Sequence, residues 1–498
     1  MRICAFSAII VREQYFFKGR YISMKRQSGV LMHVSSLWGE YSEGALGKEA
    51  REWIDFLADS GFSVWQVLPF CLPDDCNSPY KSFSAFSINP NFIDLPTLFD
   101  QGLLTADELN AARQKTPYAC EFERLERERL PLLALAATRV KNDAPIKEFL
   151  KTHPQVANFC RFMAVKAANG GAEWTDWTTE EPDEVVLRTW QFTQYEVYRQ
   201  WMELKAYANR RGISIVGDIP IYVALDSADV WANREQFQLD KRNRPTAVAG
   251  VPPDYFSADG QLWGNPLYDW KRMKADGYAW WCERMTFMME LFDGVRIDHF
   301  RGLESYFSIP AGETTARNGV WKKGPGMSLI RALRPICGDK LIIAEDLGDI
   351  TPAVHKLVRD SGYPGMRVLQ FAFLGDEGSP HLPHNYDNNC VAYTGTHDNN
   401  TLLGYVWDLD DATREKLMAY CGYEGDWDAC YNAVLRVMFA SHAGLLILPV
   451  QDLLLYGSDT RINRPGNASG NWSYRITKDQ LGLLSPEKFR RWNKLYGR

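Results

Sequence analysis

The sequence predicts an α/β protein built on a closed (β/α)8 barrel, with large, mainly helical insertions on the C-terminal face of the barrel. Three observations lead to this fold class. Eight short apolar runs are rich in Val, Ile and Leu, which is typical of strands buried in a parallel sheet. Helical patterns lie between several of these runs, and eight strand–helix repeats favour a barrel of the TIM type. A chain of 498 residues is long enough to hold such a barrel and its insertions.

The expected strands are 29–35, 62–69, 213–219, 292–298, 341–345, 367–373, 390–395 and 444–449. Two of the helical patterns between them carry clear end signals. The segment 48–61 has apolar residues at helical spacing and closes at Gly61, a typical residue just after a helix. The segment 351–362 opens with Thr and Pro, which favour the first positions of a helix, and closes at Gly362.

One gap between the expected strands predicts an inserted helical subdomain. It spans residues 92–205 and is too long for a simple connection. Strongly helical, charged segments lie within it at 105–115 and 120–142.

A second long gap, residues 224–280, is rich in Gly, Pro, Asp and aromatic residues and shows little periodicity. Long loops on the C-terminal face of a barrel usually carry function, so we expect a loop-rich insertion at the active site. The run DSADVW within it favours a short helix capped by Asp226 or Ser227.

Three of the expected strands end in an acid. The runs are FDGVRIDHFRG, LIIAEDLGD and VAYTGTHDNNT, and the acids are Asp298, Glu345 and Asp398. A charge in a strand pattern has to be paired or functional. Because the carboxyl ends of barrel strands form the active-site face, we expect these three acids to meet in one cleft.

The neighbours of these acids favour acid–base chemistry. Arg296 and Asp298 are two residues apart, so they point to the same side of a strand, and the guanidinium favours an ionised, nucleophilic carboxylate. Glu345 has no basic neighbour in sequence, a setting that can raise its pKa and suit it to donate a proton. Such a pair is the retaining glycosidase arrangement, with carboxyl groups roughly 5–5.5 Å apart. Asp346 is a rival to Glu345, because one of two adjacent strand residues faces the barrel mouth and the other faces away.

Each acid taken singly also has a plainer explanation. Buried ion pairs of the Arg–x–Asp kind occur in ordinary protein cores, and a perturbed acid is not by itself catalytic. The set of three is a stronger indication than its members, because two of the acids also have a His neighbour, His299 and His397.

The motifs around these residues resemble those of the 4-α-glucanotransferases, also called amylomaltases or disproportionating enzymes, which form family 77 of the glycoside hydrolases. The resemblance runs from about Lys25 to the end of the chain. The motifs that carry it are GVLMHVSSL (29–37), WQVLPF (65–70), SPYKSFSAFSINP (78–90), VGDIPIYVALDSADVWAN (216–233), GVPPDYFSADGQLWGNPLYDW (250–270), VRIDHFRG (295–302), IIAEDLG (342–348), GTHDNNT (395–401) and RINRPGNASGNWSYR (461–475).

The resemblance implies roles for the three acids. Asp298 matches the family's nucleophile and Glu345 matches its general acid/base, which decides against Asp346. Asp398 matches the third acid, which holds sugar hydroxyls and helps to distort the ring. The remaining matches are residues expected to bind substrate: Arg296, His299, His397, Asp218, Tyr80, Trp263 and Asn463.

The resemblance also implies an activity. We expect transfer of segments of α-1,4-glucan to the 4-hydroxyl of another glucan or of glucose, with maltooligosaccharides and α-1,4-glucans as donor and acceptor. This chemistry needs no cofactor and no metal ion. His381 and His384 form an HxxH in a loop without an acidic partner in register, so we interpret them as surface residues and not as a metal site.

Composition narrows the class of protein and its location. The net charge of −6 and a pI of about 5.9 give no basic footprint for nucleic acid. Ten cysteines without regular spacing or a CxxC favour reduced thiols in a cytoplasmic protein. Residues 1–24 are expected to be an N-terminal extension, either ahead of the true start at Met24 or a small accessory element. Outside this extension, no apolar run reaches membrane-spanning length, so no membrane is expected as a partner.

Three alternatives stay open at this point. An α-amylase-type hydrolase would share the barrel and the acids but use water as the acceptor. A glucan-binding protein that has lost catalysis would keep the aromatic cleft, although the presence of all three acids argues against it. A nucleotide-sugar transferase would want a Gly-rich turn that cradles phosphate, and the run GPGM (324–327) follows no expected strand.

Overall fold

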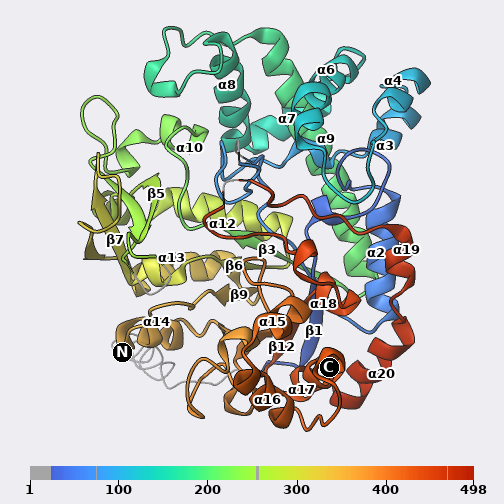
Figure 1. The fold of residues 1–498 in the computed structure, drawn as a ribbon. Coiled ribbons are helices and arrows are strands. Elements are labelled where there is room, and N and C mark those ends of the chain that lie inside the picture. Colours follow the sequence, from blue (N-terminus) through green and yellow to red (C-terminus); the bar gives the residue numbers. More distant parts are fainter. Residues whose placement is uncertain (1–23, 74–75, 254–256, 468) are drawn as a thin grey trace, which may run out of the picture.

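The computed structural model describes residues 24–73, 76–253, 257–467 and 469–498, so the expected extension lies outside the described residues except for Met24. Eight parallel strands close into a barrel in the order β1-β12-β11-β10-β9-β6-β3-β2, which confirms the predicted fold class (Figure 1). The strands are β1 (Gln27–Leu31), β2 (Val64–Gln66), β3 (Ser214–Ile219), β6 (Gly294–Ile297), β9 (Leu341–Ala344), β10 (Gly365–Val368), β11 (Cys390–Tyr393) and β12 (Leu445–Pro449).

Alternate strand residues fill the inside of the barrel and the layer between strands and helices. On β12, Leu445 and Ile447 belong to one cluster of buried residues, whereas Leu446 and Leu448 belong to another. The first cluster takes residues from seven of the barrel strands, so it is the packed interior. The sequence runs are continuously apolar because both faces of each strand are buried.

The sixth barrel strand lies earlier in the chain than predicted. We expected 367–373, but β10 ends at Val368 and the chain then turns into a 3-10 helix, Leu369–Phe371. The strand begins at Gly365, which pairs with β9 and β11. The sequence Pro364–Gly365 is typical of a turn. In the structure Gly365 belongs to the strand, and glycine is needed there because a Cβ would lie 2.4 Å from Oδ2 of Asp346.

The helices with clear end signals form as expected. α2 (Lys48–Asp59) is followed by Gly61 in the left-handed region, with φ of 76°. α14 (Pro352–Ser361) is capped by Thr351, whose hydroxyl accepts from the Val354 N–H, and ends at Gly362. The other long helices that follow β3 are α12 (Ala279–Leu291), α13 (Met327–Cys337), α16 (Asp411–Tyr420), α17 (Tyr431–Ala440) and α20 (Pro486–Tyr496), with shorter helices at α15 (Leu402–Asp408), α18 (Val450–Leu454) and α19 (Lys478–Gly482).

The stretch 92–205 is helical and lies at the top of the molecule in Figure 1. Its helices are α3 (Leu95–Asp100), α4 (Ala106–Ala111), α5 (Phe122–Arg124), α6 (Leu130–Thr138), α7 (Ala144–Thr152), α8 (Pro154–Ala168) and α9 (Glu184–Arg210). The expected helix over 120–142 is interrupted by a π-helical turn, Leu125–Arg129, which ends two residues before Pro131. Proline has no N–H to continue the α-helical ladder, which explains a widened turn at this point.

The stretch 224–280 contains more regular structure than its sequence indicates. It holds α10 (Ala228–Ala232), β4 (Ala247–Val251), β5 (Gln261–Pro266) and α11 (Trp270–Ala275). Ser227, not Asp226, caps α10. β4 and β5 join β7 (Ser305–Pro310) and β8 (Val320–Lys323) in an antiparallel sheet of order β5-β4-β7-β8.

This second sheet lies beside the barrel, at the left of Figure 1. Its central pairing joins β4 to β7, which are far apart in the chain. Local periodicity cannot predict a pairing between such distant segments. In the described part of the chain, no helix is long and apolar enough to cross a membrane.

Candidate active site

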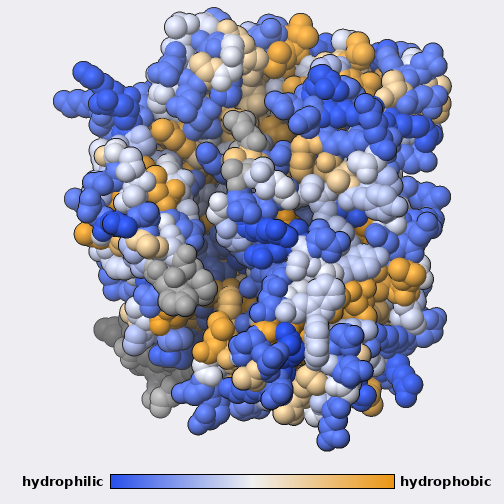
Figure 2. Space-filling view, viewed as in Figure 1, coloured by the Kyte–Doolittle hydropathy of each residue, from blue (hydrophilic) through white to orange (hydrophobic). Residues whose placement is uncertain are grey.

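Asp298 and Glu345 follow two neighbouring strands of the barrel. β6 and β9 pair in parallel with Ile297 opposite Ala344, so the next residue of each strand is an acid. The Glu345 N–H donates to the carbonyl of Ile297 at 3.1 Å, which continues the ladder as far as the acids. Figure 2 shows a hollow in this face of the molecule, in front of the place where Figure 1 draws β3, β6 and β9.

Arg296 lies at the centre of the charged groups. Its Nη1 contacts both carboxylate oxygens of Asp218, at 2.9 and 2.7 Å, and its Nη2 contacts Oδ1 of Asp298 at 2.7 Å. Arg296 and Asp218 are buried, and charge-assisted bonds of this kind fix orientation as well as charge. Arg296 therefore holds Asp298 in one orientation, and the pairing follows from the strand parity expected from the sequence.

The two acids have different surroundings. The side chain of Asp298 is 29% exposed and contacts a guanidinium, whereas Glu345 is only 9% exposed. Burial, followed by the negative charge of Asp298, raises the pKa of Glu345 to about 7. Two N–H groups donate to its carboxylate, from His299 at 2.7 Å and from Leu347 at 2.8 Å, and orient it. Two carboxyl groups in such unlike settings suit two different roles.

His299 occupies a strained backbone position between the acids. Its φ of 49° is in the left-handed region, uncommon for a residue other than Gly. Burial lowers the pKa of His299 to about 4, so the ring is neutral at pH 7. Trp263, from β5 of the second sheet, packs edge to face on it with ring centroids 4.9 Å apart. The second sheet thus supplies one wall of the site.

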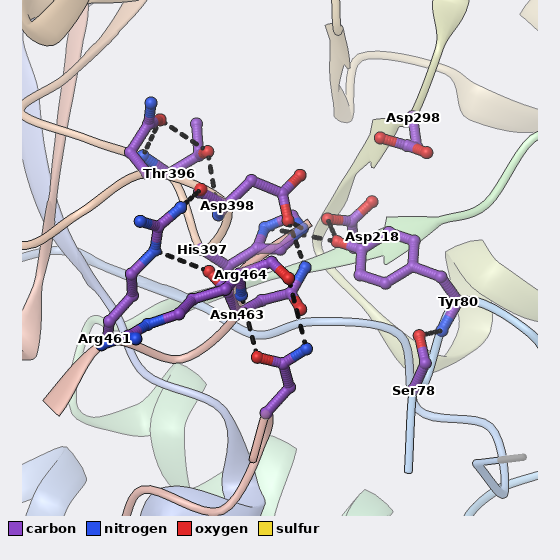
Figure 3. Close-up of polar contacts among 12 residues, drawn as sticks. Ser78, Tyr80, Asp218, Asp298, Thr396, His397, Asp398, Arg461, Asn463 and Arg464 are labelled. Carbon is purple, nitrogen blue, oxygen red and sulfur yellow. Dashed lines mark hydrogen bonds and ion pairs between the residues drawn. The ribbon is translucent and has the colours of Figure 1, made fainter. Parts of the chain in front are cut away.

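Asp398 lies on a loop beyond β11 and is held by a second loop. Asn463 donates to Oδ1 of Asp398 at 2.6 Å, and His397 Nε2 lies 3.3 Å from the same oxygen. Tyr80 stacks on His397 with ring centroids 4.9 Å apart and donates from its hydroxyl to Oδ2 of Asp218 at 2.9 Å. Figure 3 shows these residues as one chain of polar contacts that ends opposite Asp298.

The structure brings the expected site residues together at one end of the barrel. Asp298, Arg296, Asp218, Tyr80, His397, Asp398 and Asn463 form one connected network, and Glu345 and His299 are joined to each other by a backbone bond. Trp263 is reached through His299.

The rival acid Asp346 has a structural setting. Its Oδ1 accepts from the backbone N–H of Met366 at 2.7 Å, and its Oδ2 lies 3.5 Å from Arg367. Both partners belong to β10, so Asp346 ties the end of β9 to β10.

Two contributors went unnoticed in the sequence. Trp472 packs beside both Tyr80 and His397, with ring centroids 5.9 and 5.8 Å away, and Arg461 donates to the backbone carbonyl of Asp398. Both lie in the RINRPGNASGNWSYR motif, so the signal was present in residues that carry the family resemblance. Among the described residues, no group of three or more His, Cys, Asp and Glu side chains could hold a metal ion.

Comparison with known proteins decides the family. The family model for 4-alpha-glucanotransferase of glycoside hydrolase family 77 matches residues 32–480. The chain is 44% identical to a 4-alpha-glucanotransferase from Synechocystis sp. over 499 residues, covering 95% of this chain and 98% of that protein.

The chain belongs to the 4-alpha-glucanotransferase family.

Further relatives agree with this family. A 4-alpha-glucanotransferase from Thermus thermophilus is 41% identical, with 94% of this chain and 97% of that protein covered. The amylomaltase from Streptococcus agalactiae, solved in complex with acarbose, superposes with a TM-score of 0.91 at 36% identity, covering 95% of this chain and all of that chain. The expected activity, transfer of segments of α-1,4-glucan, is thereby confirmed. Family membership decides against the alternatives of an α-amylase-type hydrolase and a nucleotide-sugar transferase.

Proposed function

We propose that this 4-alpha-glucanotransferase works by a retaining double displacement with Asp298 as the nucleophile and Glu345 as the general acid and base. The observation that carries the proposal is the contrast between these two acids on adjacent strands. Asp298 is partly exposed and contacts the guanidinium of Arg296, whereas Glu345 is buried with a pKa raised to about 7. One group is thus prepared to attack and the other to give a proton.

In the first step, a carboxylate oxygen of Asp298 forms a bond to the anomeric carbon of the donor as the bond to the glycosidic oxygen breaks. Glu345 gives its proton to that oxygen, and the reducing-end fragment leaves as a 4-hydroxyl. In the second step, Glu345, now a carboxylate, takes the proton from the 4-hydroxyl of an acceptor glucan. The acceptor oxygen replaces Asp298 at the anomeric carbon, and two inversions give retention.

The remaining site residues would position the sugar. Asp398 has one oxygen engaged by Asn463, which leaves acceptor capacity for sugar hydroxyls. His299 and His397 are both neutral at pH 7, since burial lowers the pKa of each, so each ring has one donor and one acceptor nitrogen. Hydrogen bonds from such groups strengthen as charge develops on the ring in the transition state. Trp263 and Tyr80 provide flat apolar faces for the sugar.

Maltooligosaccharides and α-1,4-glucans are the donors and acceptors that fit this site. A related amylomaltase has been solved with acarbose, which supports glucan-type ligands. Transfer instead of hydrolysis requires that a sugar outcompete water for the glucosyl intermediate, so the cleft has to exclude solvent around Asp298. The stretch 224–280 supplies a wall there through Trp263, and we propose that it and the helical stretch 92–205 are insertions that shape the cleft.

The location and metabolic setting are part of the proposal. Among the described residues, six buried cysteines carry free thiols, namely Cys71, Cys120, Cys160, Cys337, Cys390 and Cys430, which is typical of a protein in a reducing compartment such as the cytoplasm. Glucan transfer there would serve the metabolism of maltooligosaccharides, starch or glycogen.

The direct test is to incubate the purified protein with maltotriose alone and to resolve the products by chain length over time. We expect glucose together with a ladder of longer maltooligosaccharides. Glucose and maltose without longer chains would mean that water is the acceptor, which would contradict transfer. The Glu345→Gln variant is the control, since it keeps the fold while removing the proton donor.

A further inference from the structure

A second pocket, separate from the network of acids, opens between the α8–α9 connection and α10. Its volume is about 240 Å³. α8 and α10 lie side by side in the upper part of Figure 1. The pocket is lined by three indoles and a set of polar side chains, namely Trp174, Thr175, Trp177, Thr178, Thr179, Glu180, Trp231, Arg234 and Asn243.

The indoles of this pocket are fixed in place by the protein itself. The Trp174 Nε1–H donates to the carbonyl of Leu225 at 2.7 Å, and the Trp177 Nε1–H donates to the carbonyl of Ala172 at 3.0 Å. The rings of Trp177 and Trp231 lie 5.8 Å apart at an angle of 58°. Both are partly exposed, so their faces form a rigid, angled surface that a ligand can meet without ordering these side chains first.

Several polar groups around the indoles have donors or acceptors that are not engaged in hydrogen bonds with residues that the structure describes. Within the described part of the chain, the guanidinium of Arg234 stacks over Trp174 at 4.8 Å and donates only from Nε, to the carbonyl of Trp231. The Glu180 carboxylate and the Asn243 amide make no hydrogen bond or ion pair to described residues. Donors and acceptors of both kinds therefore face the pocket alongside the indole surfaces.

We propose that this pocket is an accessory binding site for an α-glucan chain. Flat apolar surfaces next to unengaged donors and acceptors match a pyranose ring, which has C–H faces and an equatorial belt of hydroxyls. One positive and one negative side chain suit a neutral polyhydroxylated ligand better than an anion or a cation. The volume of about 240 Å³ is below the roughly 300–1,000 Å³ of pockets for drug-sized ligands, so it suits one or two sugar units of a longer chain.

The pocket lies on the same side of the barrel as the acids. The segment 220–226 leads from the carboxyl end of β3, next to Asp218, to Leu225 and Asp226, and both of these residues hold Trp174. Asn265 of β5, near the Trp263 that faces the acids, donates to the carbonyl of Val223 in the same segment. A long glucan held at the pocket would raise the effective concentration of its other parts at the cleft, and we expect maltotriose, with only three glucose units, not to gain from the pocket.

The proposal rests on glucans being the substrates, and the test compares short and long ones. The Trp231→Ala variant should raise KM for soluble amylose, with glucose as acceptor, about tenfold, because one aromatic stacking contact is lost. Its kcat/KM for maltotriose alone should stay within twofold of the parent. The matched control is Trp427→Ala, a partly exposed tryptophan outside the pocket, with Arg414 over its face at 4.5 Å.

A second variant keeps all three indoles of the pocket. Trp231 contacts Phe162, so its loss can disturb the fold. The double change Arg234→Met with Glu180→Gln removes both charges and the guanidinium donors, including the bond to the Trp231 carbonyl, and it should raise KM for amylose about three- to tenfold. An equal change for maltotriose and amylose, or no change for either in both variants, would overturn the proposal.

Binding measured without turnover separates this proposal from the proposed function. Native electrophoresis through gels containing amylose should show retarded migration of the Glu345→Gln protein, and less retardation when Trp231→Ala is added. Retardation that is the same with and without Trp231 would overturn the accessory site whatever the enzyme does to maltotriose. If the wild type did not convert maltotriose, the proposed function would be contradicted. The gel experiment would still test the accessory site, because it measures binding without turnover.

Discussion

Asp298 and Glu345 are the first residues after two adjacent barrel strands, β6 and β9. Asp398, in contrast, lies on a loop beyond β11 and is held by residues of a second loop. The first pair is fixed by the backbone ladder between β6 and β9 and by the buried Arg296. The third acid is 46% exposed and depends on Asn463 and on the stacked rings of Tyr80 and His397. The barrel therefore sets the groups that make and break bonds, and the loops set the groups that hold the sugar.

This division means that changes on the barrel side should cost most. Asp298→Asn should lower kcat for maltotriose disproportionation by on the order of 10⁴-fold or more, because no carboxylate remains to attack the anomeric carbon. Glu345→Gln should lower it about 10²–10⁴-fold. Initial rates of glucose release measure both. Near-wild-type turnover of Asp298→Asn would remove the basis of the assignment.

Changes on the loop side should cost less. Asn463→Ala leaves the Asp398 carboxylate in place but removes the donor that orients it, and we expect kcat/KM for maltotriose to fall about tenfold, a loss of about 1.4 kcal/mol of transition-state stabilisation. The same rate measurement applies. A loss as large as that of Glu345→Gln would show that the loop takes part in the chemistry and would erase the contrast between the two sides.

The pH dependence of the reaction should report the barrel side. Glu345 has to be protonated for the first step, and its pKa is raised to about 7, so kcat/KM should fall as the pH rises through about 7. A pH–rate profile of the wild type measures this limb. The limb should be absent from the residual activity of Glu345→Gln, and a limb that persists there would assign the titration to another group.

The same pKa has a consequence for stability. The folded protein holds the Glu345 proton more tightly than the unfolded chain does, so the contribution of Glu345 to stability falls as the pH rises from about 4.5 to about 7. Glu345→Gln removes this loss. Urea unfolding should therefore show the variant gaining stability relative to wild type as the pH rises, and a pH-independent difference would contradict the raised pKa.

Asp346 offers the smallest effect on the chemistry and a separate effect on the fold. Asp346→Ala leaves the buried Met366 N–H without its acceptor, which should cost about 1–3 kcal/mol of stability. Turnover of the folded variant should remain within a few-fold of wild type. Thermal unfolding and rates on maltotriose check the two halves, and a loss of turnover like that of Glu345→Gln would restore Asp346 as a catalytic candidate.

Local sequence patterns predicted most of the barrel side, whereas Asn463 and Tyr80 on the loop side were expected only from the family resemblance. Strand parity placed Arg296 beside Asp298 because a two-residue repeat is a local property of a strand. The choice between Glu345 and Asp346 needed the family resemblance, because parity does not say which face points to the mouth. The contact of Asn463 with Asp398 joins residues far apart in the chain, and no local pattern encodes such a contact.

The same physical limit explains the elements that were missed. β4 and β7 pair across a long stretch of chain, and their short sequences contain little periodicity. The shift of β10 follows from Gly365, which local rules assign to a turn although the strand needs its lack of a Cβ beside Asp346. The pocket between α8 and α10 combines residues from two separate segments, so only the folded chain shows it.

The most direct test of the central claim is to trap the glucosyl intermediate on Asp298. The Glu345→Gln variant is mixed with an α-maltotriosyl fluoride whose terminal 4-hydroxyl is replaced by hydrogen, so that the reagent cannot serve as an acceptor. Its fluoride leaving group needs little protonation, so the first step proceeds while hydrolysis by water is slowed by the missing base. Mass spectrometry of the intact protein and of its peptides should show one 4-deoxymaltotriosyl group on the peptide that contains Asp298. An adduct on a different residue, or fluoride release without any adduct in the acceptor-free reaction, would contradict the account.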